Sequence, residues 1–103
     1  NQHSTNSVQL GNDYCAQRGV PPQNVFRMTN WNGGAVLWSR SDFEARLRDP
    51  LLAMLNSRGL TNQADYVLLS MDIPYTVGDG GSYDSTTSAL FYGFKPYGVP
   101  PLP

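Results

Sequence analysis

Residues 64–72 read ADYVLLSMD, and this stretch decides the predicted fold. Its centre, residues 66–69, is a continuous apolar run, which is typical of a strand buried on both faces, as the strands of parallel sheets are. Pro74 follows and ends the predicted strand, because proline cannot donate a hydrogen bond to a sheet ladder. The stretch therefore favours an α/β fold.

A helix and another strand are predicted upstream, over residues 6–18 and 24–28. Asn6 or Ser7 is suited to cap the start of this helix, and Gly19 is suited to end it. The strand is short, apolar and partly β-branched.

Residues 29–39, TNWNGGAVLWS, are predicted to form a loop that turns at its two adjacent glycines. Trp31 and Trp38 flank the turn. Large aromatic rings usually pack against a core, and this is the simpler interpretation of both tryptophans. Stacking on a carbohydrate or binding a partner is the alternative.

A second helix is predicted to begin at residues 41–44, SDFE. These residues form a capping box, in which Ser41 and Glu44 each accept the other's amide. Pro50 interrupts the helix, and we expect a kink or a restart capped by Asp49. The apolar residues of the helix lie on one stripe: Phe43, Leu47, Leu51, Met54 and Leu55.

The predicted order is helix, strand, kinked helix, strand, polar loop (78–85) and short helix (86–94), which is typical of an α/β fold with right-handed crossovers. Two strands make a poor sheet, and no strand precedes the first helix. We therefore expect residues 1–95 to be a partial α/β domain, a fragment of a mostly parallel three-layer sheet domain whose first strand is missing. A protein partner or missing chain is expected to complete the sheet. Residues 96–103 are predicted to be a proline-rich tail.

Composition limits the classes of function. The chain has 103 residues, of which 40 % are hydrophobic and 15 % charged, with a formal net charge of −1, so it fits one small domain. It has no basic stripe to hold nucleic acid, and no apolar run long enough to form a transmembrane segment. The single cysteine, Cys15, excludes a disulfide framework and a cysteine-based zinc site. The first residue is Asn1 and no signal-peptide pattern is present, so we expect a processed product or a piece of a longer protein.

Four motifs together resemble a large uncharacterised bacterial family that co-occurs with exosortase, a sorting system for exported proteins. They are NSVQLGNDYCAQRGVPPQNVFRM (6–28), the F…L..PL…L spacing from Phe43 to Leu55, ADYVLLSMDIPYTV (64–77) and YDSTTSALFYG (83–93). The resemblance covers about residues 4–96. It implies export, periplasmic or extracellular, and an α/β fold, but no reaction.

The chain departs from that pattern at Met71 and Asp72, which stand where a Lys-Gly pair is more usual. A weaker similarity links the chain to α/β peptidases of the caspase and gingipain type. In those peptidases a buried strand ends in a Gly-Asp pair and a Ser-Asp-Tyr loop follows, whereas this chain has Ser82-Tyr83-Asp84 in its polar loop. No match to the part of such a peptidase that carries the catalytic histidine and cysteine exists here.

The candidate ligand residues are Asp72, Asp79, Asp84 and Ser85. Ligands of open α/β sheets bind beyond the carboxyl ends of the strands, where Asp72 is predicted to lie. Asp79 and Asp84 are the candidate metal ligands, because carboxylates with nearby hydroxyls suit a hard cation such as Ca²⁺. The spacing is not that of an EF-hand, and the alternative is that Asp72 and Asp84 cap turns or the next helix.

Nucleophilic catalysis has little support in the sequence. His3 is the only histidine, and a solvated residue is its simpler interpretation. A Ser-His-Asp site would need His3, Asp72 and a serine to converge, and no nucleophile elbow is present. Cys15 is predicted to face the core as an inert thiol. Neither glycine-rich stretch has a nucleotide-binding spacing.

Two functions remain open. The first is an exported α/β domain without catalysis, acting as a structural or accessory part of a larger protein or assembly. The alternative is the remnant of a peptidase-like hydrolase with a site near Asp72 and Asp84. The sequence leaves open whether the chain is an enzyme.

Overall fold

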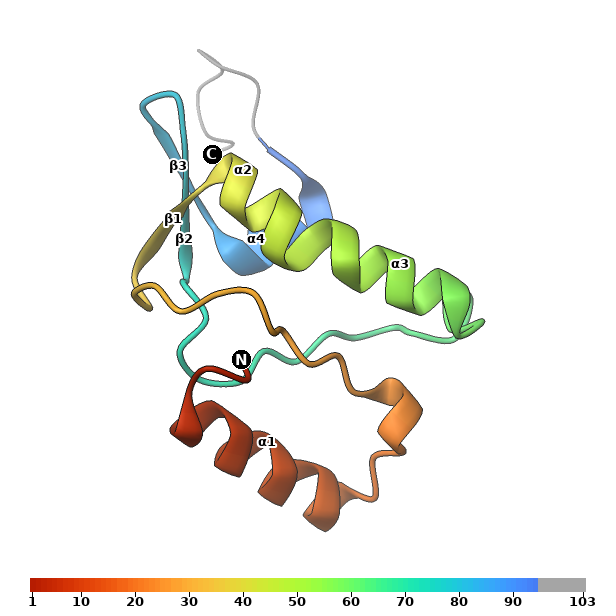
Figure 1. Cartoon of the computed structure of the whole chain (residues 1–103). Helices are drawn as coiled ribbons and strands as arrows, with labels where there is room; N and C mark the ends of the chain where they lie inside the picture. Colours follow the sequence, from red (N-terminus) through yellow and green to blue (C-terminus); the bar gives the residue numbers. More distant parts are fainter. Residues whose placement is uncertain (95–103) are drawn as a thin grey trace, which may run out of the picture.

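A small mixed sheet with helices on one face lies at one side of the molecule (Figure 1). The computed structural model of the protein describes residues 1–94. Its elements, in chain order, are α1 (Thr5–Arg18), the 3-10 turn η1 (Pro22–Asn24), β1 (Leu37–Ser39), α2 (Arg40–Phe43), the π-helical turn η2 (Glu44–Arg48), α3 (Asp49–Ser57), β2 (Thr76–Asp79), β3 (Ser82–Ser85) and α4 (Thr86–Tyr92). The predicted tail, residues 96–103, lies outside the described residues.

The sheet has the strand order β1-β2-β3. β1 and β2 are parallel, with Trp38 opposite Val77, and the helical stretch from α2 to α3 connects them. β2 and β3 are antiparallel, with Val77 opposite Asp84. The α/β class is therefore confirmed, but the described sheet is mixed rather than mostly parallel.

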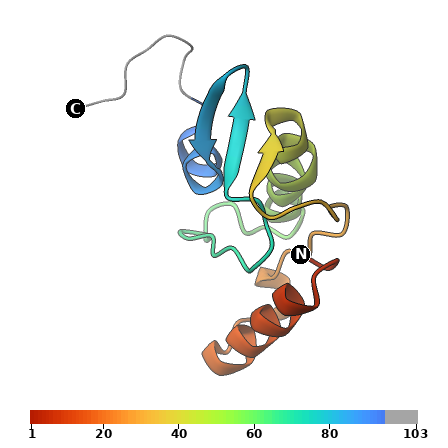
Figure 2. The same cartoon turned by 90° about the vertical axis from the view of Figure 1, so that its left-hand side faces the viewer.

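The helices α2, α3 and α4 lie on the same side of the sheet, so the described part has two layers rather than the three predicted (Figure 2). The other face carries no helix among residues 1–94. On that open face a Cβ added to Gly78 would meet Leu37 Cδ1 at 3.7 Å and Tyr83 Cε1 at 3.8 Å, so these side chains flank the glycine. α1 lies away from the sheet (Figure 1).

The prediction of a buried strand over residues 64–72 is wrong. These residues form no strand, and Tyr66 and Leu68 are 91 % and 70 % exposed. A strand needs a neighbour to take its backbone hydrogen bonds, and no described segment supplies one. The strand of the sheet is instead β2, which begins after Pro74.

Three further predictions need correction. Residues 24–28 form no strand: they begin in η1 and continue without a sheet partner, although Met28 is buried. The predicted loop 29–39 ends in β1, and the predicted loop 78–85 is mostly the β2–β3 hairpin. Gly80 and Gly81 have φ angles of 58° and 91°, which suit the two-residue turn of a hairpin.

The first helix is confirmed, but Ser4 caps it rather than Asn6 or Ser7. The Ser4 side chain accepts a hydrogen bond from the amide of Ser7, which lies three residues later. Gly19 has a φ of 63° and ends the helix as predicted.

The second helical stretch begins two residues earlier than predicted. Ser39 caps it and accepts the amide of Asp42, so the predicted Ser41–Glu44 capping box is wrong. The predicted interruption is confirmed, because the π-helical turn η2 precedes α3 and Pro50 lies in the first turn of α3. Pro50 has no backbone N–H to donate, and the wider π-helical turn accommodates this. Asp49 does not act as the new cap; its carboxylate accepts a hydrogen bond from Arg48.

The core lies between the sheet and its helices. Its fully buried cluster consists of Met28, Trp38, Phe43, Leu47, Val77 and Ala89. The ring centroids of Trp38 and Phe43 are 6.0 Å apart in an edge-to-face arrangement, and Trp31 packs edge-on against Trp38 at 5.4 Å. Both tryptophans therefore belong to the core or its rim, as the simpler interpretation predicts.

No helix among residues 1–94 is long and apolar enough to cross a membrane.

Candidate functional site

Asp72 fastens the start of α1 to the chain segment that precedes β2. Its Oδ2 accepts a hydrogen bond of 2.5 Å from Ser4 Oγ, and its carbonyl accepts one of 2.9 Å from Asn1 Nδ2. Asp72 has a φ of 59°, the only positive value among the described non-glycine residues. Aspartate tolerates this left-handed conformation better than most residues do. Asp72 therefore turns the chain and holds the first helix, rather than ending a buried strand.

His3 joins this junction only through its amide, which donates to Asn1 Oδ1 at 3.0 Å, and its side chain bonds elsewhere. Its Nε2 contacts the carbonyl of Thr29 at 2.6 Å, while Ser4 reaches Asp72 directly. His3, Ser4 and Asp72 are thus not in the serine-histidine-aspartate order that nucleophilic catalysis requires. Cys15 is half-buried in α1.

The amino group of Asn1 donates a hydrogen bond to Ser7. Burial, followed by the charge of Arg27, lowers the pKa of this amino group.

The surface groove beside His3 does not connect the predicted site residues. It is lined by Gln2, His3, Thr5, Val8, Gln9, Asn12 and Asp13, which belong to the start of the chain and to α1. Neither Asp72 nor Asp84 lies in it. The structure therefore brings His3 to a groove but keeps both candidate aspartates out of that groove.

The other candidate residues lie on the β2–β3 hairpin. Asp79 lies opposite Ser82 and Asp84 opposite Val77, so both carboxylates are on the helix-covered face of the sheet. Asp84 is only 5 % exposed. Ser85 Oγ accepts the amide of Ser88 at 3.0 Å and caps α4, so the interpretation of Asp84 as the helix cap is wrong.

No three acidic, histidine or cysteine side chains among residues 1–94 are grouped closely enough to hold a metal ion. Asp79, a predicted calcium ligand, forms an ion pair with Arg40 instead, at 3.0 Å. Calcium at this hairpin stays a prediction, and any such ion has to compete with the guanidinium.

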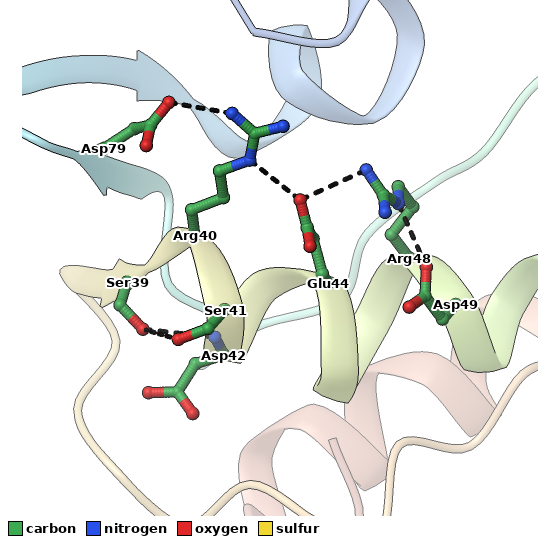
Figure 3. A network of polar contacts seen from close by, with 8 residues as sticks. All are labelled: Ser39, Arg40, Ser41, Asp42, Glu44, Arg48, Asp49 and Asp79. Atoms are coloured by element: carbon green, nitrogen blue, oxygen red, sulfur yellow. Dashed lines mark hydrogen bonds and ion pairs between the residues drawn. The ribbon is translucent and has the colours of Figure 1, made fainter.

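Arg40 is the centre of a charged network that links α2 to the hairpin (Figure 3). Its Nε donates to Glu44 Oε1 at 2.8 Å and its Nη1 to Asp79 Oδ2 at 3.0 Å. Arg48 extends the network from Glu44 to Asp49. The hydrogen bond to Glu44, followed by that to Asp79, raises the pKa of Arg40. The guanidinium also lies 4.1 Å from the centroid of the Phe94 ring, a distance typical of a cation–π contact.

Residues 65–71, which we call the extended segment, lie between α3 and β2. Their amides and carbonyls form no backbone hydrogen bonds with any described residue. Exposure alternates over its apolar part: Tyr66 and Leu68 are exposed at 91 % and 70 %, whereas Val67 and Leu69 are half-buried. Ser70 holds the segment to α1 by donating to the carbonyl of Ser7 at 2.9 Å. The segment therefore has the alternating exposure of a strand but no strand partner in the part of the chain that the structure describes.

Comparison of the chain with protein-family models, with curated proteins and with solved structures found no match.

Proposed function

We propose that this chain is an exported α/β domain that serves as a structural or accessory part of a larger protein or assembly. Its partner is a polypeptide that adds a strand to the extended segment. Export is inferred from the resemblance to the exosortase-associated family.

The observation that carries this proposal is that the backbone of the extended segment forms no backbone hydrogen bonds with other residues in the described range 1–94. Backbone N–H and C=O groups are strong hydrogen-bonding groups. An extended row of them without partners is a template for another strand. Strand addition draws its affinity from main-chain hydrogen bonds and its specificity from alternate side chains. Tyr66 and Leu68 supply that alternation, and their exposure is far above what a paired, covered strand shows.

Site-specific photocrosslinking in the cells that produce the protein tests the proposal. A photoreactive phenylalanine analogue replaces Tyr66 in one variant and Tyr92 in the control, because these tyrosines are 91 % and 89 % exposed. We expect an adduct at position 66 that mass spectrometry maps to an extended, apolar stretch of polypeptide, and none of this kind at position 92. Equal adducts at both positions, or none at position 66, would overturn the proposal.

The hydrolase remains the alternative function, with one observation in its favour. The short contact between Ser4 Oγ and Asp72 Oδ2 places a hydroxyl against a carboxylate. If this pair acts in hydrolysis, Ser4→Ala abolishes cleavage of a peptide and ester substrate panel by the full chain. If wild-type protein cleaves none of the panel, the alternative falls.

A further inference from the structure

A second surface groove lies between the C-terminal turn of α3 and the segment that follows η1. Val25, Phe26 and Met54 form its apolar wall, and each of these residues is half-buried. Phe26 also packs against the core, which holds the wall in place. The groove has a volume of about 400 Å³, near the lower end of the range of small-molecule sites. No residue of the extended segment lines it.

Arg27 and Arg58 carry the only charges among the described residues that line this groove. Arg58 is fixed there, because its Nη1 donates to the carbonyls of Gln23 and Val25 at 2.9 Å and 3.0 Å. Arg27 Nη2 donates to Asn12 Oδ1 at 3.3 Å. These acceptors are neutral, so they compensate neither positive charge. A guanidinium has five N–H donors, so each arginine keeps further donors for a ligand.

Counter-charges are distributed unevenly over the arginines of the chain. Arg40, Arg46 and Arg48, on the helical stretch from α2 to α3, each pair with a carboxylate. None of the ion pairs among residues 1–94 involves Arg27 or Arg58. Two like charges that line one groove repel each other, and an anion bound there reverses the sign of this interaction. The groove therefore combines an apolar wall with an uncompensated positive charge.

We propose that this groove binds a small aliphatic carboxylate, with the charged end at the two arginines and the chain on the apolar wall. A guanidinium matches a carboxylate in charge and in shape, because two parallel N–H donors face two oxygens. The wall removes the apolar part of the ligand from water. An amphipathic cation is repelled by the arginines, and a carboxylate without a chain makes no use of the wall. This inference goes beyond the proposed function, because the groove and the extended segment share no residue.

Titration of the full 103-residue chain with octanoate, followed by two-dimensional amide NMR, tests the site. Octanoate supplies both the carboxylate and the chain. Acetate supplies the head group alone, and octyltrimethylammonium supplies the chain with the opposite charge. We expect saturable shifts with octanoate, centred on the amides of residues 23–27 and 54–58, and none with the other two probes at the same concentration. This comparison of probes needs no variant, so it does not depend on how a substitution affects folding.

Arg27→Ala tests the role of the charge, because the Arg27 side chain is exposed and its one hydrogen bond is the exposed contact with Asn12. We expect octanoate binding to weaken by about tenfold, as is typical when a hydrogen bond to a charged group is lost. Arg18→Ala is the matched control, since Arg18 is also exposed but does not line the groove. It removes the same charge and should bind octanoate like the wild type. Circular dichroism checks that both variants keep their helices.

Three results would overturn the inference. The first is the absence of saturable octanoate binding, or equal binding of octyltrimethylammonium. The second is an equal loss, or no loss, of octanoate binding in Arg27→Ala and Arg18→Ala. The third is a set of octanoate shifts centred on residues 65–71, which would place the apolar chain on the extended segment instead. None of these results decides strand addition, which the photocrosslink at position 66 tests separately.

Discussion

Trp38 Nε1 donates a hydrogen bond of 3.2 Å to Thr86 Oγ1, and this contact joins β1 to the first turn of α4 inside the core. The same threonine hydroxyl donates to the carbonyl of Pro74 at 2.6 Å, and the threonine amide donates to the carbonyl of Tyr75 at 2.8 Å. Thr86 is only 1 % exposed. One small polar side chain thus connects a strand, a helix and the turn that leads into β2.

We predict that Thr86→Val destabilises the domain by about 1–3 kcal/mol, because it keeps the side-chain volume but leaves a buried donor and a buried acceptor unpaired. Urea unfolding measures the change. The matched control is Thr87→Val, on an exposed neighbour, where a change within about 0.5 kcal/mol is expected. Equal effects at both positions would contradict the role of the buried hydroxyl.

The core should be most sensitive at Phe43, which is fully buried between the rings of Trp38 and Phe94, at centroid distances of 6.0 Å and 5.7 Å. We predict that Phe43→Ala costs about 3–5 kcal/mol, since it removes apolar contact and leaves a cavity. Phe91→Ala, on the exposed face of α4, serves as the control and should cost far less. Thermal unfolding followed by circular dichroism compares the two variants.

The sequence predicts the helices better than the strands, and the reason is the range of the interactions involved. α1 carries its own end signal at Gly19, and the stretch from α2 to α3 carries its apolar stripe and its interruption at Pro50. The caps were misplaced by two or three residues, because several serines in each region are chemically equivalent candidates. The local sequence is enough to predict that these helices form. The first residue of each helix is harder to predict, because neighbouring serines can all act as the cap.

The strands were misplaced because pairing, not apolarity, defines a strand. Residues 66–69 are a continuous apolar run but have no strand partner among residues 1–94, whereas β2 has a single buried apolar residue, Val77, and pairs on both sides. The hairpin did carry a local signal, the adjacent Gly80 and Gly81 between alternating residues, which is typical of a two-residue turn. The acidic residues around it suggested a ligand loop instead.

The candidate site was predictable only in part. Asp79 stood out as a chemically capable carboxylate, but its partner Arg40 is 39 residues away and is brought close only by the fold. The Arg40–Glu44 pair, by contrast, follows helical spacing and could have been found from sequence. The contact between Ser4 and Asp72, 68 residues apart, has no local signal at all.

Substitutions at Gly80, which has a φ of 58° in the hairpin turn, should differ strongly in their effect on stability. We predict that Gly80→Val costs roughly 1–3 kcal/mol, because a β-branched residue is strained in the left-handed region. Gly80→Asn should be close to neutral, since asparagine is favoured at this turn position. Gly34→Val is the control, because Gly34 has no positive φ and a Cβ there meets no atom within 4 Å. Differential scanning calorimetry of the three variants checks the order.

Calcium should have little effect on the wild-type protein, because the Arg40 guanidinium already neutralises Asp79. We predict an unchanged melting temperature on adding CaCl₂ or EDTA. Arg40→Ala removes the competing cation, while Arg46→Ala, on the same helical stretch, leaves Asp79 paired and serves as the control. A melting temperature that rises with calcium in the wild type and returns with EDTA would establish the predicted cation at the hairpin.

Asp72 combines an unusual backbone conformation with the contact to Ser4, and three substitutions separate these contributions. We predict that Asp72→Ala destabilises the domain by roughly 1–3 kcal/mol, because alanine is strained at a positive φ and cannot accept the serine hydroxyl. Asp72→Asn should cost less, since asparagine tolerates the conformation and still accepts a hydrogen bond. Asp72→Gly avoids the strain but also cannot accept the Ser4 hydroxyl. The free energy of unfolding that this variant loses therefore measures the contact with Ser4. Urea unfolding gives the three values. If alanine and glycine cost the same, the positive φ of Asp72 contributes nothing, and the junction is held by the hydrogen bond alone.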